Sequence, residues 1–137
     1  MRFKGKVLKD GKFWYIEVPE LDVMTQGYTK KEAFEMIADA IEMLVDKPGF
    51  KVEVTPVSKE EFEVGSADTA TLVALLLQRR RQAKGLTLAE TAKLIGAKSQ
   101  NAYARYEQGK SMPTVPKLME LLSAVDGHDF VLSRSHS

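Results

Sequence analysis

Residues 96–110, GAKSQNAYARYEQGK, contain side chains that could read a base sequence. The amides of Gln100 and Asn101 can pair bidentately with adenine, and the guanidinium of Arg105 can bind guanine or a phosphate. Ala104 is small enough to let a helix backbone approach a base edge. This spacing predicts a short helix shaped to enter a DNA groove. The alternative is an ordinary surface helix whose tyrosines pack into a core.

The flanking sequence predicts the elements that would position this helix. The capping-box sequence TLAE at residues 87–90 opens a helix that should end at Gly96, and Ser99 can cap a second helix. Further helices are expected before residue 84 and after Thr114. Two short helices that are joined by a tight turn and framed by two others are the parts of a helix-turn-helix.

The charge distribution favours an anionic partner for this region. A net charge of +1 hides an asymmetry, because residues 1–66 carry 10 basic and 13 acidic side chains, whereas residues 67–137 carry 10 and 6. Residues 79–117 hold nine basic residues and only two acidic ones, which favours phosphate binding. The residues predicted to contact double-stranded operator DNA are Thr87, Lys98, Ser99, Gln100, Asn101, Ala104, Arg105 and Lys110.

Composition limits the class of protein. The chain has no cysteine, which excludes disulfides and thiolate metal sites and is typical of a reducing compartment. No apolar run approaches the ~20 residues that cross a bilayer, and the N-terminal MRFKGKV lacks a signal-peptide core. We therefore expect a cytoplasmic protein without a membrane partner.

The N-terminal half predicts a small α+β layer. RFKGKVL and KFWYIEV alternate in polarity on either side of Asp10-Gly11, which predicts a hairpin. Residues 21–28 are expected to form a third strand and residues 50–55 a fourth. Between them, the capping box TKKE at residues 29–32 predicts a helix that runs to about residue 46 and packs on the sheet. The predicted fold class is α+β, with the order β-β-β-α-β before an all-α domain.

These elements divide the chain into two domains. Residues 1–57 form the α+β domain, and residues 58–68 form a polar linker that can contain a brief strand at residues 61–64. Residues 69–137 form the helical domain, which ends in a lone strand at residues 129–133. That strand could pair with its twin across a two-fold axis or return to its own domain. Because specific operator binding normally requires two DNA-binding domains, we expect a homodimer or higher homo-oligomer.

Two resemblances to known families rest on these motifs. LTLAETAKLIGAKSQNAYARYEQGKSMPTVPKLMELL resembles the Xre-type, phage-repressor-like helix-turn-helix. The shared features are the cap Thr87, Ala92, the turn residue Gly96, the ending YEQGK at residues 106–110 and Pro113. The sequence departs from that pattern at residue 88, a leucine where the family often has glutamine, and in a turn that is one residue longer. The resemblance implies a DNA-binding repressor of transcription.

The second resemblance covers the N-terminal half. GKFWYIEVPELDVMTQGYTKKEAFEMIADAIEML is similar to the HicB antitoxin family, with a strand ending in a Pro-Glu-Leu loop, a Thr-Gln-Gly element and an EA-containing helix. The resemblance implies a partial ribonuclease-H-like fold with an appended DNA-binding module. It also implies an antitoxin function, in which the domain neutralises HicA, a small basic toxin that cleaves messenger RNA.

An acidic domain suits a basic partner, because complementary charge speeds encounter and covers an RNA-binding surface. The acids of the predicted helix form a stripe, Glu32, Glu35, Asp39, Glu42 and Asp46, which could equally be its solvated side. Trp14 and Tyr15 fall on opposite faces of the hairpin, and an exposed aromatic there could anchor a partner. The residues predicted to contact the toxin are Trp14, Glu20, Asp22, Glu32, Glu35 and Asp39.

Catalysis is not expected. Two-metal phosphodiester cleavage needs carboxylates that converge from several strands, but Asp10 falls in a turn and Glu17 stands alone on its strand. His128 and His136 fall in the C-terminal tail, and no Gly-rich phosphate loop is present. We therefore predict no catalytic residues, no metal and no cofactor. The alternatives are a stand-alone transcriptional regulator with a sensing N-terminal domain, and an active nuclease.

Overall fold

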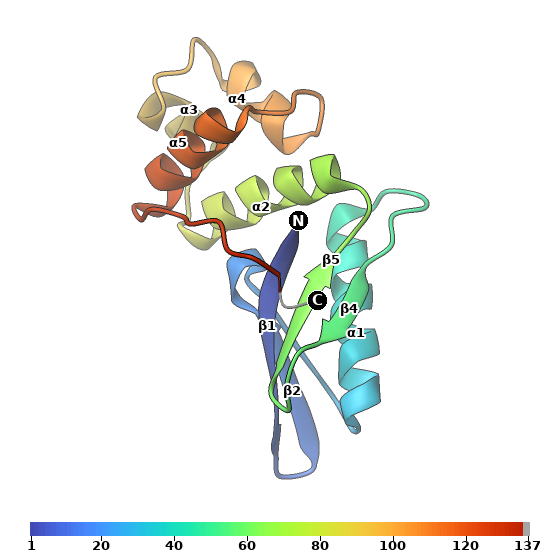
Figure 1. Ribbon diagram of the computed structural model, residues 1–137. Helices are drawn as coiled ribbons and strands as arrows, with labels where there is room; N and C mark the ends of the chain where they lie inside the picture. Colours follow the sequence, from blue (N-terminus) through green and yellow to red (C-terminus); the bar gives the residue numbers. More distant parts are fainter. Residues whose placement is uncertain (136–137) are drawn as a thin grey trace. The chain divides into compact units, whose positions relative to one another are not determined.

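The computed structural model describes residues 1–135, and these residues form two compact units (Figure 1). The first unit comprises Met1–Leu72 together with Arg134 and Ser135, and the second comprises Val73–Ser133. The tail histidine His136 lies outside the described residues.

The first unit is built on a five-stranded antiparallel sheet with the strand order β3-β2-β1-β5-β4. Its strands are β1 (Arg2–Asp10), β2 (Phe13–Val18), β3 (Val23–Gly27), β4 (Glu53–Pro56) and β5 (Glu61–Gly65). A 3-10 turn, η1 (Pro19–Leu21), joins β2 to β3. The fold class is therefore α+β, as the sequence predicts, because one helix covers one face of this sheet (Figure 1).

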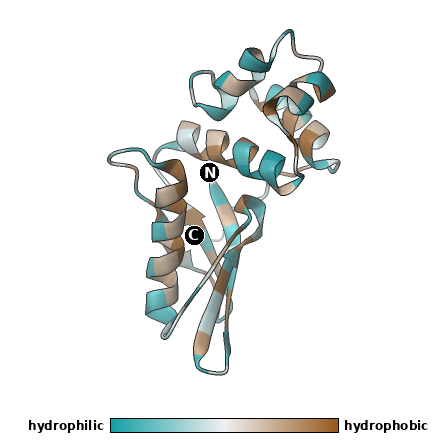
Figure 2. Ribbon diagram, turned by 180° about the vertical axis from the view of Figure 1, so that it is seen from behind, coloured by the Kyte–Doolittle hydropathy of each residue, from teal (hydrophilic) through white to brown (hydrophobic). Residues whose placement is uncertain are grey.

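That helix, α1 (Lys30–Val45), begins where the sequence predicts. The hydroxyl of Thr29 accepts the Glu32 backbone N–H at 3.0 Å and thereby caps the first turn. Polar and apolar residues alternate around the helix (Figure 2). Its fully buried residues recur every four positions and face the sheet: Ala33, Ile37 and Ile41.

A close approach between α1 and the edge strand β3 depends on Gly27. A Cβ atom at this position would lie 2.7 Å from the backbone nitrogen of Ala33, which is too close for any side chain. The helix therefore rests directly on the strand, and Gly27 fixes the separation of the two layers at this point.

The sheet differs from the prediction at β4 and β5. The predicted strand over residues 50–55 starts only at Glu53, because the Val52 N–H donates to the Glu42 carboxylate at 2.9 Å instead of to a neighbouring strand. The brief strand predicted at residues 61–64 is present as β5, but it is part of the sheet and not of a linker, because it lies between β1 and β4 and buries Phe62 and Val64. A boundary at residue 57 was therefore too early, and the observed order is β-β-β-α-β-β.

Asp68 fixes the start of α2 (Thr69–Ala83) within the first unit. Its carboxylate accepts hydrogen bonds from Lys47 Nζ at 2.7 Å, from the Thr71 hydroxyl at 2.6 Å and from the Thr71 backbone N–H at 3.1 Å. The bonds from Lys47 and Thr71 lower the pKa of Asp68 from 3.8 to about 2. The carboxylate thus stays charged at pH values at which the same group in an unfolded chain would begin to bind a proton.

Acid unfolding should therefore depend on Asp68. Because the folded pKa is lowered, its contribution is complete above pH 3.8 and is lost as the pH falls to about 2. We expect Asp68→Asn and Lys47→Ala to flatten the dependence of unfolding free energy on pH across this window. Urea titrations followed by the fluorescence of Trp14, the only tryptophan, would measure it. An unchanged slope in both variants would contradict this role.

The second unit consists of the later turns of α2 with α3 (Leu88–Leu94), α4 (Gln100–Glu107) and α5 (Val115–Asp126). Thr114 caps α5 by accepting the Lys117 N–H at 3.3 Å, as its sequence predicts. The buried side chains of α3, α4 and α5 are Thr91, Ala92, Tyr103, Ala104, Leu118, Leu121, Leu122 and Val125. Figure 1 shows these three helices packed together.

The predicted strand at residues 129–133 is absent from the described structure. These residues follow the end of α5 without regular secondary structure. A strand needs the backbone of a neighbour, and within residues 1–135 no backbone hydrogen bond reaches residues 130–133. The described chain therefore contradicts only the alternative in which this strand returns to its own domain, and pairing with a second copy stays a prediction.

Candidate nucleic-acid interface

The turn between α3 and α4 is fixed by local hydrogen bonds. At the C-terminal end of α3, Gly96 has a φ of 67°, which is the left-handed conformation that favours glycine. The Gly96 N–H donates to the Lys93 carbonyl at 3.2 Å, and the Ala97 N–H donates to the Ala92 carbonyl at 2.9 Å. This pair of bonds is a Schellman motif, which ends the helix sharply.

The N-terminal ends of both helices have their predicted caps. Thr87 and Glu90 form a complete capping box, with both hydrogen bonds at 3.0 Å. The Ser99 hydroxyl accepts the Ala102 N–H at 3.3 Å. Because the oxygens of Thr87 and Ser99 already accept backbone protons, each hydroxyl keeps only its own proton for a phosphate.

One side of α4 faces the core and the other is exposed. Tyr103 is fully buried and Ala104 is only 6% exposed, so Ala104 lies on the inward side of the helix and not on the outward side where the sequence placed it. The small residue on the outward face is Ala102, which lies beside Asn101 and Arg105.

The other predicted reading side chains are accessible. Gln100, Asn101 and Arg105 are all exposed, Gln100 because it lies in the first turn of α4. The Arg105 Nε donates to the Ser111 hydroxyl at 3.3 Å, which orients the guanidinium beside the end of the helix. The outward face of α4 therefore carries two amides and one guanidinium, the groups that pair with base edges.

A buried ion pair holds α4 against α2. Arg81 donates from Nε and Nη2 to the two oxygens of Glu107 at 2.7 and 3.0 Å. Its Nη1 donates to the Leu86 carbonyl at 2.8 Å. The side chains are 12% and 6% exposed, and the Glu107 carboxylate raises the pKa of Arg81. Burial likewise raises the pKa of the neighbouring Tyr103, so its phenol stays neutral.

The basic residues of this region divide into structural and exposed groups. Arg80 is not part of a free phosphate-binding surface, because its Nη2 and Nε donate to Asp126 at 2.6 and 3.1 Å. Together with Arg81, it ties α2 to the other helices. The exposed basic side chains around α3 and α4 are Lys93, Lys98, Arg105 and Lys110. Lys93 was not among the predicted contacts, although its place in the last turn of α3 could have indicated it.

The predicted aromatic anchor of the first unit is partly covered. Trp14 is half-buried, and Lys30 Nζ lies 5.8 Å from its ring centroid. Tyr15 points to the opposite face of the sheet and is 40% exposed. The exposed aromatic of this pair is therefore Tyr15, which the prediction did not choose.

The acidic stripe of α1 separates into two kinds of residue. Glu35 and Asp39 are exposed. Glu32 and Glu42 are half-buried, and each accepts a backbone N–H, from Tyr28 at 3.4 Å and from Val52 at 2.9 Å respectively. These two carboxylates fix loops, so they are less suited to contact a partner.

The two predicted acids of the β2–β3 connection take different positions. Glu20 is half-buried within η1. Asp22 is exposed and adopts a left-handed conformation with a φ of 51°, while its N–H donates to the Pro19 carbonyl at 3.0 Å. Asp22 is therefore the more exposed of these two acids.

Among residues 1–135, no cluster of histidine, cysteine or acidic side chains could hold a metal ion. None of the described helices combines the length and apolar character that crossing a membrane requires. Both findings apply to the part of the chain that the structure describes.

Residues 77–128 match a protein-family model described as Helix-turn-helix. The match runs from α2 to just past α5 and covers less than half of the chain. None of the curated proteins matches the chain. The second unit is therefore a helix-turn-helix domain, the class that binds DNA in transcription regulation.

Proposed function

We propose that the protein is an autorepressing antitoxin of the HicB type. Its helix-turn-helix unit binds the operator of its own operon, and its first unit neutralises a HicA-like toxin that cleaves messenger RNA. The proposal places the protein in the cytoplasm, where both targets occur, and assigns it no catalytic step. The observation that carries the DNA-binding half is the exposed face of α4 within the matched domain.

The chemistry of that face suggests how DNA would be read. Asn101 and Arg105 would reach base edges in the major groove, while Lys98 and Lys110 would neutralise phosphates. The two helix-turn-helix units of a homodimer would contact half-sites about 34 Å apart, one turn of the double helix.

The toxin-binding half rests on the resemblance of residues 11–44 to the HicB family and on the exposed acids of the first unit. The partial ribonuclease-H-like relationship belongs to this resemblance. Glu35 and Asp39 lie one helical turn apart on α1, where both carboxylates are exposed. A basic, RNA-binding toxin would meet complementary charge there, and its RNA-binding surface would be covered.

Co-purification with a HicA-like toxin tests this proposal. The tagged full chain should retain the toxin, and reversing two charges in Glu35→Lys with Asp39→Lys should weaken the complex by about tenfold or more. Glu120→Lys, which reverses an exposed acid in the second unit, is the matched control and should bind normally. Failure of the unmodified chain to bind would favour the alternative, a stand-alone regulator whose first unit senses another signal.

A further inference from the structure

Residues 129–133, DFVLS, form an apolar tail segment directly after the helix-turn-helix. Val131 is 85% exposed and Leu132 is 77% exposed, which makes them more exposed than any other large apolar residue described except Met43. Leaving two adjacent aliphatic side chains in water forgoes roughly 25 cal/mol for each Å² that burial would remove from solvent. The segment therefore gains free energy if another surface covers it.

The backbone of this segment is also unpaired, although its flanks are held. The Ser123 hydroxyl donates to the Asp129 carboxylate at 3.4 Å, and the Ser135 hydroxyl donates to the Glu63 carboxylate at 2.8 Å. Between these points, within the described chain, no backbone hydrogen bond reaches residues 130–133. Phe, Val and Leu in sequence suit a strand, so this is a strand-forming segment that lacks a neighbouring strand.

The sequence of the segment complements itself. In an antiparallel pair centred on Val131, this residue faces its own copy, Phe130 faces Leu132, and Asp129 faces Ser133. The β-branched pair and the aromatic–aliphatic pair are favourable cross-strand neighbours, and no like charges lie directly opposite within the five residues. The same segment of a second copy of this chain is therefore a suitable partner strand.

We propose that residues 129–133 of two chains pair as an antiparallel two-stranded ribbon and join two helix-turn-helix units into a dimer. The inference rests on the proposed function and deepens it, because the ribbon would join the two helix-turn-helix units that an operator with two half-sites requires. The segment begins three residues after α5 ends at Asp126, so the pairing would act close to the DNA-binding domain. An isolated two-stranded ribbon is marginally stable, so the dimer should dissociate on dilution.

Single-cysteine variants test the pairing and its register, because the natural chain has no cysteine. Under mild oxidation, Val131→Cys should form disulfide dimers at least about tenfold faster than Leu132→Cys, since residue 131 faces its copy within disulfide reach and residue 132 does not. Met43→Cys, at an exposed position on α1, is the control for random collision. A rate for Val131→Cys no higher than that of Met43→Cys would overturn the proposal.

Sedimentation without DNA or toxin provides the second measurement. The unmodified chain should shift from monomer to dimer as its concentration is raised, and Val131→Pro should keep it monomeric because proline cannot donate a backbone N–H to the ladder. Met43→Asp should leave the dimer unchanged. A monomeric unmodified chain, or a dimer that survives Val131→Pro, refutes the ribbon. Operator binding is measured separately, so a failed ribbon would leave the DNA-binding proposal standing.

Discussion

The Asn101→Ala, Arg105→Ala double variant is expected to lose operator recognition while keeping its fold. Both side chains are exposed on α4, so their removal leaves no buried cavity. Each base contact of this kind contributes about 1–3 kcal/mol, so the double variant should bind its operator on the order of 100-fold more weakly. Binding of the proposed toxin, which we assign to the first unit, should be unaffected.

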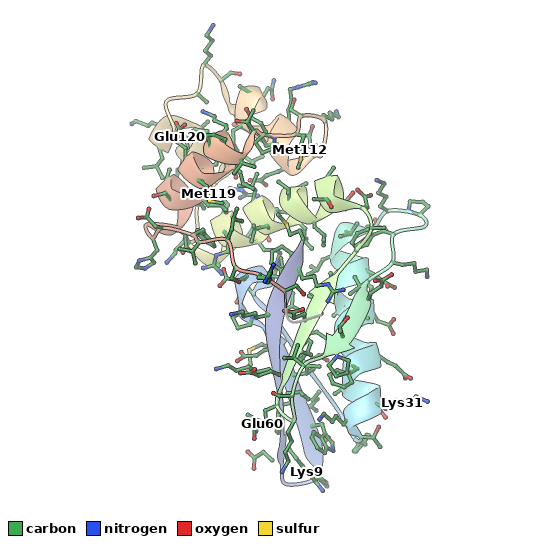
Figure 3. The ribbon with its side chains drawn as sticks, viewed as in Figure 1. Lys9, Lys31, Glu60, Met112, Met119 and Glu120 are labelled. Atoms are coloured by element: carbon green, nitrogen blue, oxygen red, sulfur yellow. The ribbon has the colours of Figure 1, made fainter. Side chains whose placement is uncertain are left out.

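Fluorescence anisotropy at fixed salt would separate base contacts from phosphate contacts. Lys98→Ala should weaken binding to operator and unrelated DNA alike. It should also reduce, by about 1, the slope of the logarithm of the binding constant against the logarithm of the salt concentration. Lys31→Ala removes an exposed charge from the first unit (Figure 3) and serves as the control. If the double variant binds its operator normally, another face of the domain reads the DNA.

Glu107→Ala is expected to destabilise the helix-turn-helix strongly. It leaves the Arg81 guanidinium buried with only the Leu86 carbonyl as a remaining partner. Removing one member of a buried ion pair costs about 3–5 kcal/mol, a large part of the stability of a small domain. Thermal unfolding followed by circular dichroism should show the loss, and operator binding should fall with it.

Two comparisons identify the cause of that loss. Glu120→Ala removes an exposed acid that lies 3.5 Å from Lys117, and it should change stability by less than about 0.5 kcal/mol (Figure 3). The apolar pair Arg81→Met with Glu107→Leu should recover most of the stability, because no charge is left buried. Equal instability of the single and double variants would show that packing, not the unpaired charge, is responsible.

The starts of helices could be predicted from the sequence because capping is local. Thr29, Thr87, Ser99 and Thr114 each accept a backbone N–H three residues later, as their positions indicate. The glycine that ends α3 follows from the same short-range geometry. These signals are sufficient to predict the helix-turn-helix and most of its exposed residues.

Features that depend on distant residues were less predictable. β5 pairs with β1 across more than fifty residues of chain, so its place in the sheet left no local signal. Arg80 and Arg81 were counted from the sequence as part of a phosphate-binding charge, because their partners on α5 and α4 are far away in the chain. The inward position of Tyr103 could be predicted, but Ala104, the next residue along the helix, is buried beside it instead of facing outward.

The position of β5 in the sheet has a practical consequence for truncated forms of the protein. β5 pairs with β1 on one side and β4 on the other. A fragment that stops before Glu61 would leave both strands with vacant hydrogen-bonding edges and uncover the apolar layer that Phe62 and Val64 complete. Such a fragment would be prone to aggregate. A soluble fragment of the first unit therefore has to extend beyond Gly65.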